Sequence, residues 1–224
     1  MVVRSALTHD TARDAAESLV AIVTTEGSAR HPHLVSLGSL DSAVTTRNAS
    51  DALHHLSMLH GRHPGVLDHA AARTTMDKAR SALFALADRF MLEREYLGRL
   101  VVAAGPIPST PGQAETEASV IHQRHAIEML SQSDRQGCAV GAALAVALDW
   151  QSFGSLLAAS GRRFGVDAVP PPAIDSRELA DIARIACGTP ATDRAMLFGA
   201  QQIAVQHRGL WDLLEARATA RGPH

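Results

Sequence analysis

Two ionisable residues, Glu93 and His207, stand where the surrounding apolar pattern predicts burial. Each interrupts a long helical seam of apolar side chains. A buried carboxylate or imidazole is costly unless another group pairs with it. The partner could be the other of these two residues, a third side chain or a metal ion. Alternatively, Glu93 lies at the edge of its seam beside a local arginine, and His207 is a core histidine satisfied by hydrogen bonds.

His125 and Glu128 add a second pair of possible ligands. Residues three apart lie on one face of a helix, so the two side chains can point to the same side. Together with Glu93 and His207 they would supply two carboxylates and two imidazoles, a set that could hold iron, manganese or zinc. The alternative is a solvated or salt-bridged strip formed with Arg124.

Histidines are concentrated in one part of the chain, with seven of the twelve between His31 and His69. Only His60 and His63 are compactly spaced, and Asp51-x-x-His54 is a weaker pair, so these spacings do not predict a metal site. Asp149 follows an apolar run. It either faces the same interior or marks the point where its helix returns to water.

Known catalytic motifs are absent from the sequence. It contains no Gly-x-Ser-x-Gly, no phosphate-binding loop ending in Gly-Lys-Ser/Thr and no dinucleotide-binding glycine fingerprint. The glycines of GCAVG lie inside an apolar helix and are predicted to serve packing.

Two long helices must position Glu93 and His207. In the first, apolar residues step by three and four at Met76, Ala79, Leu83, Leu86, Phe90, Leu97, Leu100 and Ala104. Gly105-Pro106 ends this helix. The last helix starts at Thr189-Pro190, and its seam consists of Met196, Ala200, Ile203, His207, Leu210 and Leu214.

Start and stop signals place the remaining helices. We expect helices at about 10–26, 48–61, 114–132, 137–160 and 175–188, and a loop with at most one short helical turn over 28–46. The fold class is therefore all-α, a multi-helix bundle around one central apolar helix rich in Gly and Ala. Residues 1–224 form a single domain, in which 1–47 are an N-terminal helix and loop, 48–165 the core bundle, and 166–224 a proline linker with two docking helices.

Composition limits the possible functions. Of 224 residues, 46% are apolar, enough for one sizeable core, and the net charge of −2 offers no basic excess for nucleic acid. The two cysteines, Cys138 and Cys187, are expected to be free buried thiols. The twelve-residue run Gly137–Leu148 is too short to span a bilayer, and the N-terminus lacks the apolar core of a signal peptide. We therefore expect a soluble cytoplasmic protein without a membrane partner.

Long helices with inward carboxylates and histidines resemble the ferritin-like superfamily. The resemblance covers residues 76–214 and rests on Glu93, His125, Glu128 and His207. It implies an iron or manganese site, which such bundles build from Glu and Glu-x-x-His ligands. This chain has no Glu-x-x-His, so a single-metal or metal-free bundle fits better than a di-metal centre. The segments GPIPSTPG, QRHAIEML and GCAVGAALAVALDW also look like those of an uncharacterised bacterial family, which implies no function.

Two functional hypotheses follow. The first is a helical bundle that acts by partner binding or as a homodimer, since no catalytic motif is complete. The alternative is a ferritin-like protein with redox activity at a metal held by Glu93, His125, Glu128 and His207. A third hypothesis is a small-molecule sensor with an apolar pocket between helices.

Overall fold

The described residues of the computed structural model are almost entirely helical and contain no strand; they are 15–39, 42–107, 110, 112–167, 174–186 and 188–222. Residues 15–26 form the first described helix. The later helices are α2 (Pro32–Ser39), α3 (Ala43–His60), α4 (Val66–Arg73), α5 (Asp77–Ala104), α6 (Gln113–Ser131), α7 (Cys138–Trp150), α8 (Gly154–Phe164), α9 (Ser176–Ala186) and α10 (Pro190–Arg221). A short 3₁₀ turn, η1 (Gln151–Phe153), joins α7 to α8.

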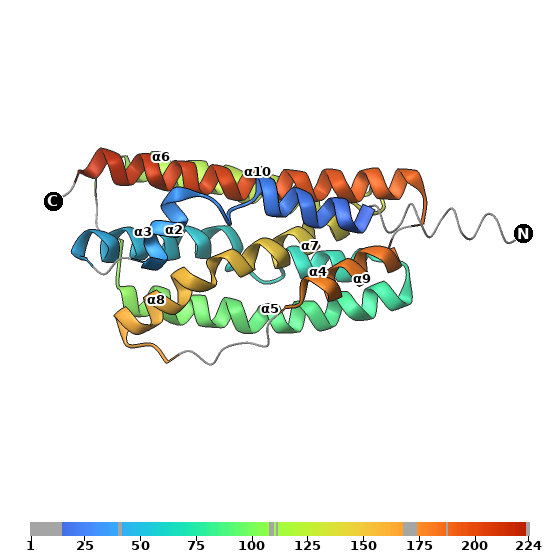
Figure 1. The fold of residues 1–224 in the computed structure, drawn as a ribbon, viewed down its shortest axis with the longest axis horizontal. Coiled ribbons are helices and arrows are strands. Elements are labelled where there is room, and N and C mark those ends of the chain that lie inside the picture. Colours follow the sequence, from blue (N-terminus) through green and yellow to red (C-terminus); the bar gives the residue numbers. More distant parts are fainter. Residues whose placement is uncertain are drawn as a thin grey trace, which may run out of the picture.

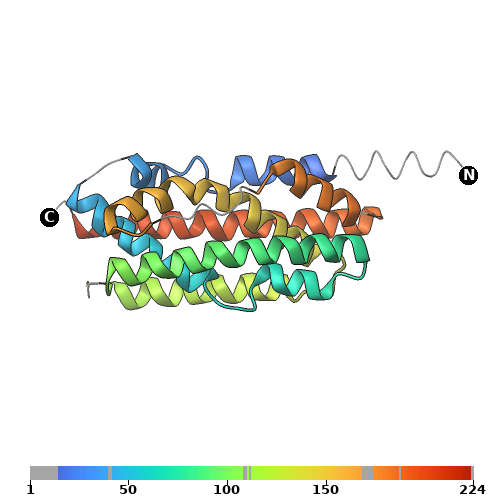
Figure 2. The ribbon, with the colours of Figure 1, turned by 90° about the horizontal axis from the view of Figure 1, so that it is seen from below.

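The molecule is an elongated bundle in which the longest helices run along one axis. Figure 1 shows α10 along one side and α5 along the other, with α3 and α7 between them. In Figure 2, which is turned by 90°, both α5 and α6 lie below α10 in the view. This all-helical arrangement confirms the predicted fold class at its coarse level.

Helix α7 is the central helix that the sequence predicts. Twelve of its thirteen residues are buried. Its closest neighbour is α10, and two glycines permit the approach. A Cβ on Gly141 would lie 1.9 Å from the Met196 carbonyl oxygen, and one on Gly199 would lie 2.2 Å from that of Cys138. The two backbones are therefore in direct contact, which fixes α10 along α7.

Several predicted helix ends are confirmed. Gly105 follows α5 with φ 75°, a backbone conformation that favours glycine. The Thr189 hydroxyl accepts a hydrogen bond from the Thr192 backbone N–H at 3.2 Å, and Pro190 occupies the first helical position. These signals depend on the conformational preferences of single residues, so they can be predicted from the sequence.

The prediction for residues 28–46 is wrong in detail. They contain the two-turn helix α2, and α3 starts at Ala43 because the Ser42 hydroxyl caps it, 3.1 Å from the Thr45 N–H. The short helix α4 was not predicted. Eight-residue helices such as α2 and α4 are stabilised by packing rather than by an intrinsic pattern, so apolar periodicity detects them poorly.

Both long seams are largely as predicted. All six seam positions of α10 are buried, His207 included. In α5 the seam is buried from Ala79 to Leu100 except at Glu93, which is half-buried, whereas Met76 lies before the helix and is 47% exposed. The two interruptions thus lie in different surroundings.

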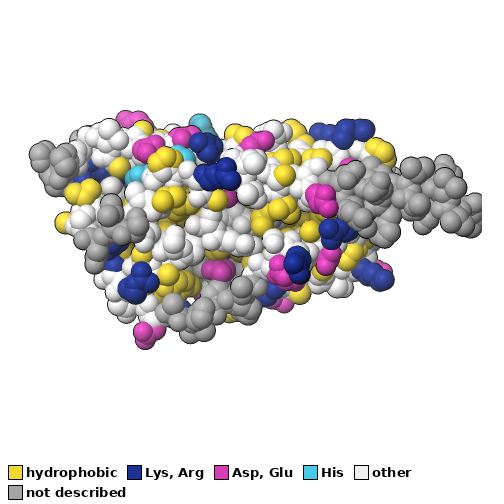
Figure 3. Space-filling model, viewed as in Figure 1, with side chains coloured by type: hydrophobic (Ala, Val, Ile, Leu, Met, Phe, Trp, Pro, Cys, Tyr) yellow, Lys and Arg dark blue, Asp and Glu magenta, His cyan; other side chains and the backbone are white. Residues whose placement is uncertain are grey.

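The surface carries no dominant charge on the face that Figure 3 shows. Acidic and basic side chains are interspersed there, with apolar groups between them. Residues 138–164 are long and apolar enough to cross a membrane, but 78% of the most apolar window is buried inside the bundle. Cys138 is a buried free thiol, whereas Cys187 lies outside the described residues.

Candidate functional site

Four polar side chains meet inside the bundle, at Ser28, His60, Asp149 and His207. All are buried; the most exposed, His60, is 6% accessible. His60 is the last residue of α3, Asp149 is the penultimate residue of α7, and His207 lies in the middle of α10. Ser28 follows the first described helix. Three helices and a turn thus converge on this group, which we call the buried relay.

Asp149 is the hub of the buried relay. Its Oδ1 accepts the Ser28 backbone N–H at 2.9 Å, and its Oδ2 accepts the Ser28 hydroxyl at 2.5 Å. The same Oδ2 lies 2.7 Å from Nδ1 of His207. The turn wraps the carboxylate closely, because a Cβ on Gly27 would lie 2.6 Å from Oδ1. The buried carboxylate therefore has a full set of donors.

The two imidazoles are joined edge to edge. Nε2 of His207 lies 2.8 Å from Nε2 of His60, and the ring planes are nearly perpendicular. Since both atoms are ring nitrogens, one of them must carry the proton and the other must accept it. The relay therefore runs from Ser28 through Asp149 and His207 to His60.

Burial and hydrogen bonding shift the pKa values of Asp149 and His60. Burial alone would raise the pKa of Asp149, but the bond and charge of His207 and the two bonds from Ser28 outweigh it and hold the pKa below its usual value. Burial lowers the pKa of His60 far below 6.5, and the charges of His207 and Arg94 lower it further. Asp149 is thus ionised and His60 neutral at neutral pH.

Aromatic rings enclose the imidazole pair. His60 meets Trp150 edge-on with centroids 5.8 Å apart, and Phe153 lies 5.7 Å from His207. Trp150 also contacts Phe90, and Phe153 contacts Trp211. These rings exclude water from the interior, which strengthens each polar interaction within the buried relay.

His60 also lines a small pocket between α3, α4, α5 and α6. The cavity is about 30 Å³, which holds roughly two waters. Its polar wall is formed by His60, Arg62, His69, Arg94, Arg124, Glu128 and Ser131. Arg94 braces the wall, because it donates to Asp68 at 3.0 Å and to the Arg62 carbonyl at 3.2 Å. The buried relay therefore ends at a pocket, and His60 connects the two.

The four predicted metal ligands do not form one site. No group of three or more His, Cys, Asp or Glu side chains within the described ranges could hold a metal ion. His207 is engaged with Asp149 and His60, and burial raises the pKa of Glu93, with a smaller opposing effect from Trp150. The partners of His207 come instead from α7 and α3, which carry Asp149 and His60.

His125 and Glu128 follow the alternative given above for this pair. His125 is 73% exposed, and Glu128 lies 3.4 Å from Arg124 and 3.9 Å from His125, which makes a salt-bridged strip. Glu128 nevertheless lines the pocket of His60. Of the four candidates, Glu128 thus lies in the pocket wall. His207 lies behind His60, which separates it from the pocket.

Three of the four relay members, His60, Asp149 and His207, were named from the sequence, but they were not placed together. Asp149 faces the interior, which is the first of its two predicted alternatives. His60 was grouped with His63, although the buried positions Ala49, Leu53, Leu56 and His60 follow the same three-and-four spacing as the other seams. That spacing is the signal that would have found it. Ser28 has no comparable signal, because it lies in a turn.

Comparison with known proteins identifies a family. Residues 23–222 match the family of unknown function DUF6975. The chain belongs to this family. The matched segment contains all four members of the buried relay. No curated protein and no solved structure matches the chain.

Proposed function

We propose that the pocket beside His60 is an acid–base centre in which a bound water or hydroxyl group loses a proton to His60. The observation that carries this proposal is the 2.8 Å contact between His60 and His207, with Asp149 behind it and a pocket in front. An imidazole oriented by a second group is the usual arrangement of a general base.

The geometry allows one proton arrangement that leaves His60 a free lone pair, and this arrangement is part of the proposal. Ionised Asp149 can only accept, so Nδ1 of His207 donates to it. In the arrangement that we propose, Nε2 of His207 accepts from Nε2–H of His60. Nδ1 of His60 is then left with its lone pair. This atom is the base that we propose.

The transfer balances without another reactant. Water in the pocket loses a proton to Nδ1 of His60 and becomes hydroxide. The Nε2 proton of His60 can then pass to Nε2 of His207, which leaves His60 neutral and His207 charged. The His207 imidazolium lies beside the Asp149 carboxylate at 2.7 Å, where the charge is stabilised.

A serine nucleophile does not fit the same geometry. The Ser28 hydroxyl donates to Asp149, not to an imidazole, and Ser28 is fully buried. In a Ser-His-Asp triad the histidine lies between the other two groups. Ser28 therefore orients the carboxylate. Since the cavity holds roughly two waters, a substrate larger than water must present its reacting group at the pocket mouth.

Hydrolysis of p-nitrophenyl acetate, a small activated ester, tests the proposal. We expect His60→Asn to lower the rate above background by about 10²-fold or more, the usual contribution of a general base. His125→Gln is the matched control, because His125 is an exposed histidine outside the pocket. Circular dichroism checks that both variants remain folded. A His60→Asn protein with the wild-type rate would refute the proposal.

We also propose partner binding or homodimerisation for one face of α5. Phe84, Met91 and Val102 are spaced seven and eleven residues apart, so they lie on one line of the helix, and all three are exposed. Light scattering should show a dimer that Met91→Glu shifts to monomer. A wild-type monomer would exclude the dimer. We also propose that the protein acts in the cytoplasm.

A further inference from the structure

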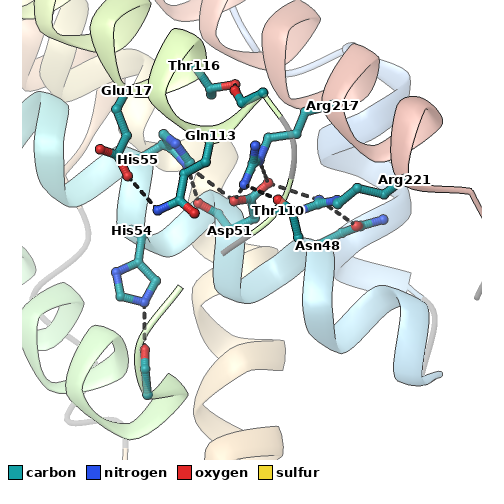
Figure 4. A network of polar contacts seen from close by, with 12 residues as sticks. Asn48, Asp51, His54, His55, Thr110, Gln113, Thr116, Glu117, Arg217 and Arg221 are labelled. Atoms are coloured by element: carbon teal, nitrogen blue, oxygen red, sulfur yellow. Dashed lines mark hydrogen bonds and ion pairs between the residues drawn. The ribbon is translucent and has the colours of Figure 1, made fainter. Parts of the chain in front are cut away.

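A second buried polar group lies on the same two helices, about nine residues away from the buried relay. Figure 4 shows Asp51 of α3 facing Arg217 and Arg221 of α10. Asp51 is 3% exposed. Arg217 Nε lies 3.2 and 3.0 Å from its two oxygens, and Arg221 Nη2 lies 2.9 Å from Oδ2. We call these three residues, together with Arg47, the arginine cluster.

Among the described residues, the buried guanidiniums of Arg217 and Arg221 outnumber the carboxylates that face them. The side chains of Arg217 and Arg221 are only 4% and 7% exposed, yet they share one carboxylate among the described residues. Glu117, also drawn in Figure 4, is turned toward Gln113, whose amide donates to it at 2.8 Å. A buried positive charge without a counter-charge is strongly unfavourable, so the excess of guanidiniums among the described residues favours the binding of an anion.

Unused donors point to the same need. Neutral oxygens take some guanidinium N–H groups, since Arg217 donates to Thr110 at 2.9 Å and Arg221 to Asn48 at 3.0 Å. Nη1 of Arg217 and Nε of Arg221 are buried and have no partner among the described residues. Burial lowers the pKa of Arg221; Asp51 opposes this, and Arg217 and Arg47 add to it by repulsion.

Arg47 connects the cluster to the surface. Its Nη2 donates to the Gly222 carbonyl at 2.9 Å, close to Arg221 at the end of α10. Arg47 also lines an open pocket of about 470 Å³, together with Thr46 and Ser50. These three residues lie on α3, the helix that carries Asp51, and they would offer an entering anion a guanidinium and two hydroxyl groups.

We propose that the arginine cluster is a binding site for a small oxyanion, of the phosphate or sulfate class, that enters beside Arg47. Guanidinium groups suit such ligands, because their planar N–H forks match two oxygens of one anion. Asp51 holds the two buried guanidiniums in position, and the anion supplies the missing negative charge. This site is separate from His60 and does not depend on the acid–base proposal.

Calorimetric titration of the full chain with inorganic phosphate tests the site. We expect saturable binding at constant ionic strength that sulfate displaces and chloride does not. Arg47→Gln should weaken binding about tenfold, the loss of one charge-assisted hydrogen bond. Arg177→Gln, at an exposed arginine of α9, is the matched control and should bind as the wild type does.

A second measurement covers the case in which Arg47→Gln disturbs the fold. Asp51→Asn removes the one carboxylate, so phosphate should raise its unfolding temperature more than it raises that of the wild type. Hydrolysis at His60 should be unaffected by phosphate. Absence of saturable binding, unaltered affinity in Arg47→Gln, or an equal phosphate response in Asp51→Asn would each overturn the proposal.

Discussion

The buried relay and the arginine cluster lie on the same pair of helices, α3 and α10, but differ in how their charge is compensated. In the buried relay, each acceptor of Asp149 has a donor and the two histidines share one proton. In the arginine cluster, two guanidiniums share Asp51 and keep N–H groups that have no partner in the described part of the chain.

The difference shows what each region can do. A balanced chain of hydrogen bonds can move a proton from one end to the other without creating an isolated charge. A cluster with excess positive charge cannot do this, but it can attract an anion. One helix pair thus combines a group suited to proton transfer with a group suited to ligand binding.

Removing the carboxylate of the arginine cluster should have the largest effect. Asp51→Asn leaves two buried guanidiniums without their counter-charge, and we expect the free energy of unfolding to fall by about 3–5 kcal/mol. Urea denaturation in chloride buffer measures it. A loss under about 1 kcal/mol would mean that solvent or another group already compensates these arginines.

The corresponding substitution in the buried relay, Asp149→Asn, should lower the free energy of unfolding by less. Asp149→Asn keeps the shape of the side chain and one acceptor oxygen, and the groups that it bonds are a hydroxyl and an imidazole rather than two guanidiniums. We expect a loss of about 2–3 kcal/mol, the range for hydrogen bonds to a charged group. Urea denaturation under identical conditions gives the comparison. If Asp149→Asn costs more than Asp51→Asn, the assignment of balanced and unbalanced charge is reversed.

The pH dependence of stability should be specific to the buried relay. The folded pKa of His60 lies below 6.5, so the unfolded chain binds more protons, and the free energy of unfolding falls as the pH drops below 6.5. His60→Asn should reduce this slope by about 1 kcal/mol per pH unit. Burial also lowers the pKa of His33 and His55, so some slope should remain. An unchanged slope would show that His60 is protonated in the folded protein.

The smallest effect is expected outside both regions. His125→Gln alters an exposed side chain with one weak ion pair, and its free energy of unfolding should stay within about 0.5 kcal/mol of wild type. Thermal unfolding suffices as the measurement. A larger change would show that the strip of Arg124, His125 and Glu128 contributes to stability.

Much of the fold was predictable, because it depends on local signals and periodicity. The seams of α5 and α10, the cap at Thr189 and the end at Gly105 are all visible in the sequence. The apolar run of α7 likewise predicts a helix buried on all sides. The short helices α2 and α4 were not predictable in this way, because tertiary packing decides them.

The site was predictable only in part. His207 was expected to be buried with a compensating partner, and it is. Glu93, which was also expected to take part, is only half-buried, and Asp149 of α7 is the acid that meets His207. Which acid faces which imidazole depends on how helices pack, and a single sequence does not specify that pairing.

Long-range ¹H–¹⁵N correlation spectra of His60 and His207 test the central claim most directly. Near neutral pH they should show His60 neutral, with a proton on Nε2 and none on Nδ1, and His207 protonated on Nδ1. His60 should remain neutral as the pH falls well below 6.5. A His60 ring that is protonated on both nitrogens near pH 6.5, or that carries its only proton on Nδ1, would contradict the account.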